Sequence, residues 1–164
     1  MPHGFVVVGP DQRRPRAPRV PGSRVEIFCD AETPTASLLA GINHLAPGAR
    51  IPRHFHDYEE LQYILSGSGV VVDSGGVEHA IGPGTAVYCA AGRGAAHGFV
   101  NTGSEPLSIL FAYPTVGGRA PSLTWIDDPH PSDARASHPR RAPPRRAAYA
   151  RHPLPEGEGK QEGA

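Results

Sequence analysis

The chemistry of this 164-residue chain is concentrated in residues 48–67, which carry two histidines and a glutamate at close spacing. His54 and His56 flank Phe55. Successive side chains of a β-strand point to opposite faces, so both imidazoles would lie on one face. Glu60 follows after a short polar connection that lets the chain double back, so its carboxylate can meet the two rings from a neighbouring strand. Imidazole and carboxylate groups bind divalent transition metals, and the stretch therefore predicts a metal site.

The spacing of this stretch also matches a family pattern. Its fixed positions are Gly48, His54, His56, Glu60 and Gly67. The pattern resembles the first motif of the cupins, small β-barrel proteins in which these two His and this Glu bind a divalent metal together with a third His from a second motif. The resemblance extends over roughly residues 35–113.

A second cupin-like motif runs from Gly84 to Asn101 and would supply the third histidine, His97. It departs from the family pattern in two ways: Ala90 replaces the usual proline, and two extra residues precede the histidine. Because the loop is longer and rich in glycine, we expect His97 to be the least rigidly held ligand. The resemblance implies that one divalent metal is bound by His54, His56, Glu60 and His97. This ligand set does not choose among Fe, Mn, Ni, Co, Cu and Zn.

Further residues are candidates for a substrate pocket. Gln62 and Phe99 each lie two positions beyond a predicted ligand, on the same strand face, so they could line the pocket. Tyr63 and Tyr88 are candidates for the pocket wall or for a subunit interface. Arg93 is the only charged side chain in the loop before the third histidine, and it could meet an anionic or carbonyl-bearing substrate at the barrel mouth. The alternatives are core packing for the aromatic residues and a solvent-facing position for the arginine.

Short apolar segments separated by turns rich in Gly and Pro, without a helical period, indicate an all-β fold. We predict a single antiparallel β-barrel of the cupin or jelly-roll type over residues 23–128. Residues 1–22 read as an N-terminal arm, because proline recurs every few positions. Residues 115–129 could wrap the barrel and place Trp125 on its outside or over its mouth. Residues 129–164, rich in Pro, Arg and Ala, are predicted to be a disordered tail.

The balance of 16 basic and 16 acidic residues conceals an uneven distribution of charge. The predicted barrel is acidic and both flanks are basic, but no aromatic platform or DNA-reading helices accompany the basic tail. We therefore expect no nucleic-acid partner. The two cysteines are too few for a disulfide framework, and the first apolar run is too short for a signal peptide or a membrane span. We predict a cytoplasmic protein.

The resemblance suggests two functions. The first is a metal-dependent cupin enzyme that acts on a small oxygenated organic molecule, with dioxygenase-, isomerase- or polyketide-cyclase-like chemistry. The second is a non-catalytic metallo-cupin that binds a sugar or metabolite as a sensor. In either case the partner is a small-molecule ligand, and we expect a homodimer.

Overall fold

A computed structural model of the protein describes residues 5–32 and 37–129. These residues belong to one compact unit. The predicted disordered tail, apart from Pro129, lies outside the described residues. In the described part of the chain, no helix has the length and apolar character needed to cross a membrane.

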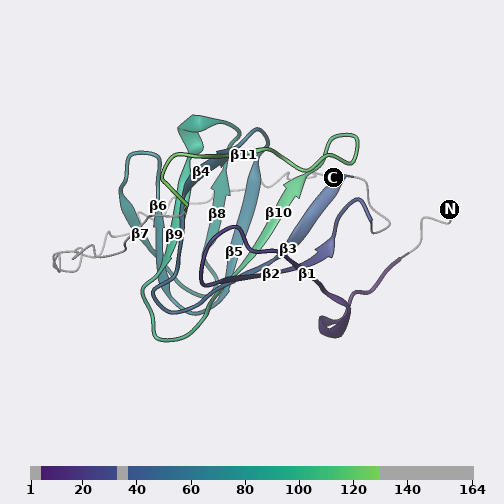
Figure 1. Ribbon diagram of the computed structural model, residues 1–164, viewed down its shortest axis with the longest axis horizontal. Helices are drawn as coiled ribbons and strands as arrows, with labels where there is room; N and C mark the ends of the chain where they lie inside the picture. Colours follow the sequence, from purple (N-terminus) through teal and green to yellow (C-terminus); the bar gives the residue numbers. More distant parts are fainter. Residues whose placement is uncertain (1–4, 33–36, 130–164) are drawn as a thin grey trace, which may run out of the picture. The chain divides into compact units, whose positions relative to one another are not determined.

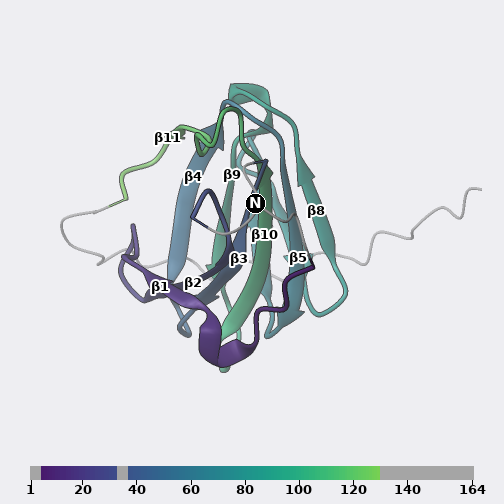
Figure 2. The same ribbon diagram turned by 90° about the vertical axis from the view of Figure 1, so that its right-hand side faces the viewer.

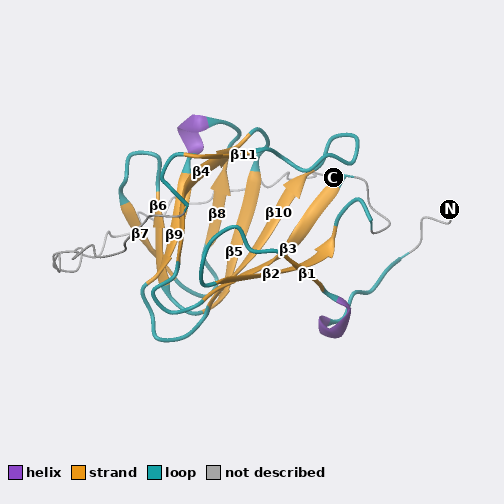
Figure 3. Ribbon diagram, in the orientation of Figure 1, coloured by secondary structure: helices purple, strands orange, loops and turns teal. Residues whose placement is uncertain are grey.

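The described residues form two antiparallel sheets and two short 3-10 turns (Figure 3). The six-stranded sheet has the order β1-β2-β3-β10-β5-β8. Its strands are β1 (Arg14–Arg16), β2 (Ser23–Cys29), β3 (Leu38–Leu45), β5 (Glu60–Ser66), β8 (Ala86–Cys89) and β10 (Leu107–Pro114). The five-stranded sheet has the order β11-β4-β9-β6-β7. Its strands are β4 (Arg50–His56), β6 (Gly69–Val72), β7 (Glu78–Ile81), β9 (His97–Asn101) and β11 (Leu123–Trp125).

The two sheets face each other, as Figure 2 shows for β4 on one side and β8 on the other. The inward faces follow the alternation of the strands, and the core between them contains Leu45, Ile64, Phe99, Leu107 and Ile109, all at most 2% exposed. Alternation along β5 buries Gln62 and Ile64 but leaves Leu61 and Tyr63 exposed. The all-β jelly-roll fold predicted from the sequence is confirmed.

The N-terminal arm takes part in the fold. Arg14–Arg16 form the edge strand β1, which pairs antiparallel with β2 (Figure 1). Pro15 is tolerated there because an edge strand leaves one row of backbone groups without ladder partners. The structure thus extends the six-stranded sheet into a segment that the sequence assigns to an arm.

Two motif glycines occupy turns that require a left-handed backbone. Gly48 has φ of 77° and Gly67 has φ of 80°. A Cβ atom on Gly67 would also lie 2.5 Å from the carbonyl oxygen of Pro106. The motif positions flanking the metal ligands are therefore glycine for backbone reasons.

Asn101, the last residue of the second motif, is 1% exposed and joins three parts of the barrel. Its Nδ2 donates to the carbonyl oxygens of Leu45 and Glu105, each at 2.8 Å. Its Oδ1 accepts from the backbone N–H of Gly103 at 2.9 Å. The amide thus satisfies backbone groups at the end of β3 and in the turn between β9 and β10.

We predict that Asn101→Ala lowers the free energy of unfolding by about 2–3 kcal/mol, because it leaves buried backbone groups without partners. Urea unfolding followed by circular dichroism measures the effect. Thr102→Ala, at the exposed neighbouring position, should change stability by less than about 0.5 kcal/mol. Equal stability of the two variants would contradict the role assigned to Asn101.

Candidate metal centre

The four predicted metal ligands come together between the two sheets. His54 and His56 project from β4 and His97 from β9, where it lies opposite His54 in the strand register. Glu60 comes from β5, the next strand along the chain, which lies in the facing sheet. All four side chains are buried, and their candidate ligand atoms lie within 4.8 Å of one another.

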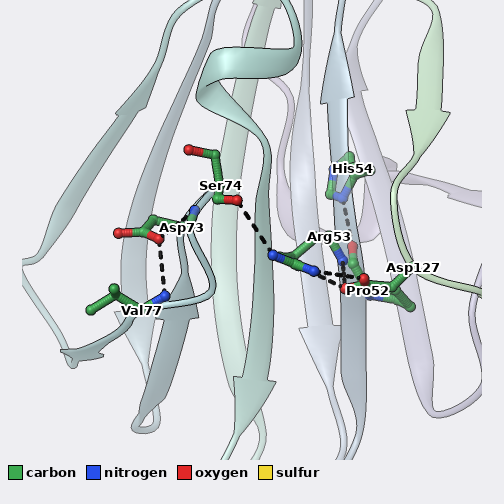
Figure 4. Close-up of polar contacts among 8 residues, drawn as sticks. Pro52, Arg53, His54, Asp73, Ser74, Val77 and Asp127 are labelled. Atoms are coloured by element: carbon green, nitrogen blue, oxygen red, sulfur yellow. Dashed lines mark hydrogen bonds and ion pairs between the residues drawn. The ribbon is translucent and has the colours of Figure 1, made fainter.

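Backbone carbonyl groups orient the three imidazole rings. The Nδ1 atom of His54 donates to the carbonyl oxygen of Pro52 at 2.9 Å (Figure 4). The Nδ1 atom of His56 donates to Ser122 at 2.8 Å, and that of His97 donates to Ala95 at 3.0 Å. With the proton held on Nδ1, the Nε2 lone pair of each ring is free to bind a metal.

The glutamate completes the set. Oε2 of Glu60 lies 3.0 Å from Nε2 of His97 and 3.6 Å from Nε2 of His56. With each Nδ1 atom protonated, this buried oxygen has no hydrogen-bond donor among the described residues. Either a proton on Nε2 of His97 or a cation must satisfy it. The donor set and this orphaned oxygen therefore fit a divalent transition metal.

The pKa values of the histidines support this fit. Burial lowers the pKa of His54 to about 3 and lowers that of His56, so both rings are neutral, as metal ligands must be. Burial also acts to lower the pKa of His97, but hydrogen bonds with Cys89 and Glu60 outweigh it and raise this pKa to about 10. The carboxylate of Glu60 thus favours a positive charge next to it, and a bound divalent cation would supply that charge.

The loop that carries the third histidine is folded against β4. Within this loop, residues Arg93–Ala95 form a 3-10 turn, η2. The N–H of Gly92 donates to the carbonyl oxygen of His56 at 2.7 Å, and this bond ties the loop to the strand that supplies two ligands. Gly92 itself has φ of 91°, which glycine adopts without strain.

A cavity of about 110 Å³ leads from the surface to the ligands. A single water needs only about 10–15 Å³, so the space can accommodate a small organic molecule. Most of its wall is apolar, with Leu39, Ile51, Phe99, Ile109 and Phe111 among the lining residues.

The structure separates the five candidate pocket residues into two groups. Gln62 and Phe99 line the cavity, as their spacing suggests. Tyr63, Tyr88 and Arg93 do not line it and are exposed. The two tyrosines lie on the outer face of the six-stranded sheet, away from the cavity.

Sequence reasoning missed several residues of the cavity. Tyr113 lines it, and its hydroxyl lies 3.4 Å from Nε2 of His56. Alternation with Ile109 and Phe111 along β10 could have indicated this inward position. Arg16 and Arg19 also line the cavity. No local pattern marks them, because their position depends on how the N-terminal segment packs.

The segment that carries Trp125 packs against the candidate metal ligands and lines the cavity. In the antiparallel register, Trp125 pairs with His54, and the two ring centroids are 5.3 Å apart. The position over the cavity, one of the two alternatives from the sequence, is the one observed. Arg53 anchors this segment through a bidentate ion pair with Asp127, with two bonds of 2.9 Å (Figure 4). The N–H of Ile126 also donates to the carbonyl oxygen of Arg53 at 2.7 Å.

Residues 41–113 match the family model described as "Cupin domain". This part of the chain is a cupin domain. No curated protein matches the chain.

Solved structures share the fold. The polyketide cyclase RemF from Streptomyces resistomycificus is 22% identical, with a TM-score of 0.64 over 76% of this chain and 87% of that one. A sugar phosphate isomerase of the cupin superfamily from Silicibacter pomeroyi is 24% identical, with a TM-score of 0.63 over 75% and 83% of the two chains. KdgF from Halomonas sp. is 20% identical, with a TM-score of 0.57 over 69% and 96%. At these identities the likeness establishes the cupin fold alone.

We predict that His54→Ala or His97→Ala weakens Zn²⁺ binding by more than the ~10–100-fold that loss of an outer hydrogen-bond partner typically costs. Isothermal titration calorimetry with Zn²⁺ measures the affinity. His44→Ala and His79→Ala are matched controls, since these rings contact Ser108 and Asp73 and not the four ligands. Equal affinities in all four variants would refute the ligand assignment.

A second prediction concerns the anchor of the segment that carries Trp125. The hydrogen bond from Arg53 lowers the pKa of Asp127 in the folded protein. The ion pair therefore stabilises the fold at pH values above the ordinary Asp pKa of about 3.9. This stabilisation is lost as the pH falls through the lowered pKa that Asp127 has in the folded protein. Asp127→Asn should therefore be less stable than the wild type at pH 7, and the difference should shrink below about pH 4. Urea unfolding followed by the fluorescence of Trp125, the single tryptophan, measures it. Glu78→Gln, at an exposed position on β7, controls for loss of a charge; a pH-independent difference for Asp127→Asn would contradict the ion-pair explanation.

Proposed function

We propose that this protein is a metal-dependent cupin enzyme that acts on a small oxygenated organic molecule. The observation that carries the proposal is the cavity, which is large enough for such a molecule and is lined by His54, His56 and Glu60 at its inner end. A site that only stabilised the fold would need no open space beside its ligands.

The ligand set suits catalysis when a metal is bound. A divalent ion held by His54, His56, Glu60 and His97 would retain open positions, so it could polarise a substrate oxygen or, if redox-active, support O2 chemistry. Tyr113 places a phenol hydroxyl beside this centre. Burial, followed by the charge of Glu60, raises the pKa of Tyr113 well above its ordinary value, so the hydroxyl keeps its proton and can donate a hydrogen bond to an oxygen of the substrate.

The polar groups of the wall favour a hydroxylated substrate. Gln62 is 4% exposed, and its Oε1 atom has no hydrogen-bond partner among the described residues. Its Nε2 atom lies 3.1 Å from Nε2 of His97. A substrate hydroxyl could satisfy the free amide oxygen, whose burial without a partner costs free energy.

The rest of the wall favours an apolar or aromatic body. Side chains such as Val25, Leu39, Phe111 and Trp125 provide contact area but few hydrogen-bond donors and acceptors. A sugar needs polar partners around its whole ring, whereas a phenol or polyketide needs them at a few positions. Among the chemistries suggested by the sequence, the wall therefore supports dioxygenation or cyclisation of an aromatic or polyketide substrate better than sugar isomerisation. The fold likeness to both a polyketide cyclase and a sugar phosphate isomerase does not decide between them.

The test is turnover by protein loaded separately with Fe, Mn, Ni, Co, Cu and Zn. We expect conversion of phenolic or polyketide substrates with at least one metal, loss of activity after chelation, and recovery on adding that metal back. His54→Ala should abolish turnover, and His44→Ala should retain it. Ligand binding without turnover under every metal would instead favour the sensor function.

A further inference from the structure

Two arginines of the N-terminal segment stand at the cavity and have no role in the metal centre. Arg16 pairs with Val25 in the register of β1 and β2. Paired residues of antiparallel strands point to the same side of the sheet, and Val25 lines the cavity, so Arg16 is also directed towards it.

Arg19 is held at the cavity by the chain on both sides of it. Val20, the next residue, is 5% exposed and lines the cavity. The carbonyl oxygen of Gly22 then accepts from the N–H of Ala46 at 2.9 Å. Strand β1 anchors the segment before Arg19, and these contacts anchor it afterwards, so the backbone at Arg19 is fixed beside the cavity while its side chain is exposed at the edge.

Among the described residues, neither Arg16 nor Arg19 forms an ion pair. Among the nine arginines of residues 5–32 and 37–129, five form ion pairs: Arg13, Arg14, Arg24, Arg53 and Arg119. The other four are Arg16, Arg19, Arg50 and Arg93, and only the first two line the cavity.

The only acidic residue of the lining is Glu60, which is engaged with His97 at the inner end. The outer part of the cavity is therefore electropositive, while its wall is mainly apolar.

We propose that Arg16 and Arg19 bind the acidic group, a carboxylate or phosphate, of an otherwise apolar and hydroxylated small molecule whose other end lies near Gln62 and Tyr113. The guanidinium group presents parallel N–H donors that match two oxygens of either anion. This inference rests on the proposed function for the statement that the bound molecule is a substrate. The anion site itself follows from the placement of the two arginines. It replaces Arg93, which the sequence suggests for this role, with two residues that line the cavity.

The test compares an acid with its neutral isostere. The probes are 4-hydroxybenzoate and 4-hydroxybenzamide, measured by isothermal titration calorimetry on the full chain loaded with Zn²⁺. Wild-type protein should prefer the acid. Arg16→Gln/Arg19→Gln should weaken acid binding by about tenfold or more, as expected for loss of a charge-assisted hydrogen bond, and change amide binding by less than about twofold.

Arg50→Gln is the matched control, because Arg50 is also exposed and unpaired among the described residues but does not line the cavity. It should bind both probes like the wild type. Phenyl phosphate distinguishes the two anions. If wild-type protein binds phenyl phosphate more tightly than 4-hydroxybenzoate and the double variant loses this binding, the site is assigned to phosphate. If wild-type protein binds 4-hydroxybenzoate more tightly, the site is assigned to carboxylate.

Three results would overturn the inference: no preference for the acid in the wild type, equal losses for acid and amide in the double variant, or an equal loss in Arg50→Gln. Zinc content is measured in each variant, so that a damaged metal site is recognised. Preference for the acid without turnover under any metal would retain the anion site and remove the enzymatic function. Turnover without a preference for the acid would retain the enzymatic function and remove the anion site.

Discussion

The burial of three histidines and one glutamate, the four candidate metal ligands, between two sheets is the constraint on which the rest of the structure depends. A buried imidazole must place both ring nitrogens against partners, because an unsatisfied polar group costs free energy. The Nδ1 atoms of the three rings find backbone carbonyls in three different places: β4 itself, the turn η2, and the segment before β11. The correct orientation of the ligands therefore requires that these separate segments be folded together.

The two ends of the described chain complete the site in different ways. The C-terminal segment packs Trp125 against His54 and supplies the carbonyl oxygen that orients His56. The N-terminal segment supplies Arg16 and Arg19. One end thus contributes apolar surface and ring orientation, and the other contributes charge. Removing either end would leave the four ligands in the barrel but change the space beside them.

The fold provides the candidate ligand set, whereas the two ends of the described chain shape the wall of the cavity. The ligand set belongs to the cupin domain, and proteins of this fold carry out different chemistries. Selectivity must then come from the wall of the cavity. Here the wall combines apolar surface with the phenol of Tyr113 and with the amide oxygen of Gln62 and two guanidinium groups, none of which has a partner among the described residues.

The sequence by itself determined the all-β fold and the four candidate ligands, because strand alternation and motif spacing are local patterns. It also placed Gln62 and Phe99 at the cavity, each two residues from a ligand on the same strand face. The tertiary structure alone decided that Glu60 approaches from the facing sheet and that Tyr88 and Arg93 lie outside the cavity. It alone also brought Arg16 and Arg19 to the cavity. These placements depend on sheet order, on register and on the packing of the chain ends, which are contacts between residues far apart in the chain and leave no periodic signal in it.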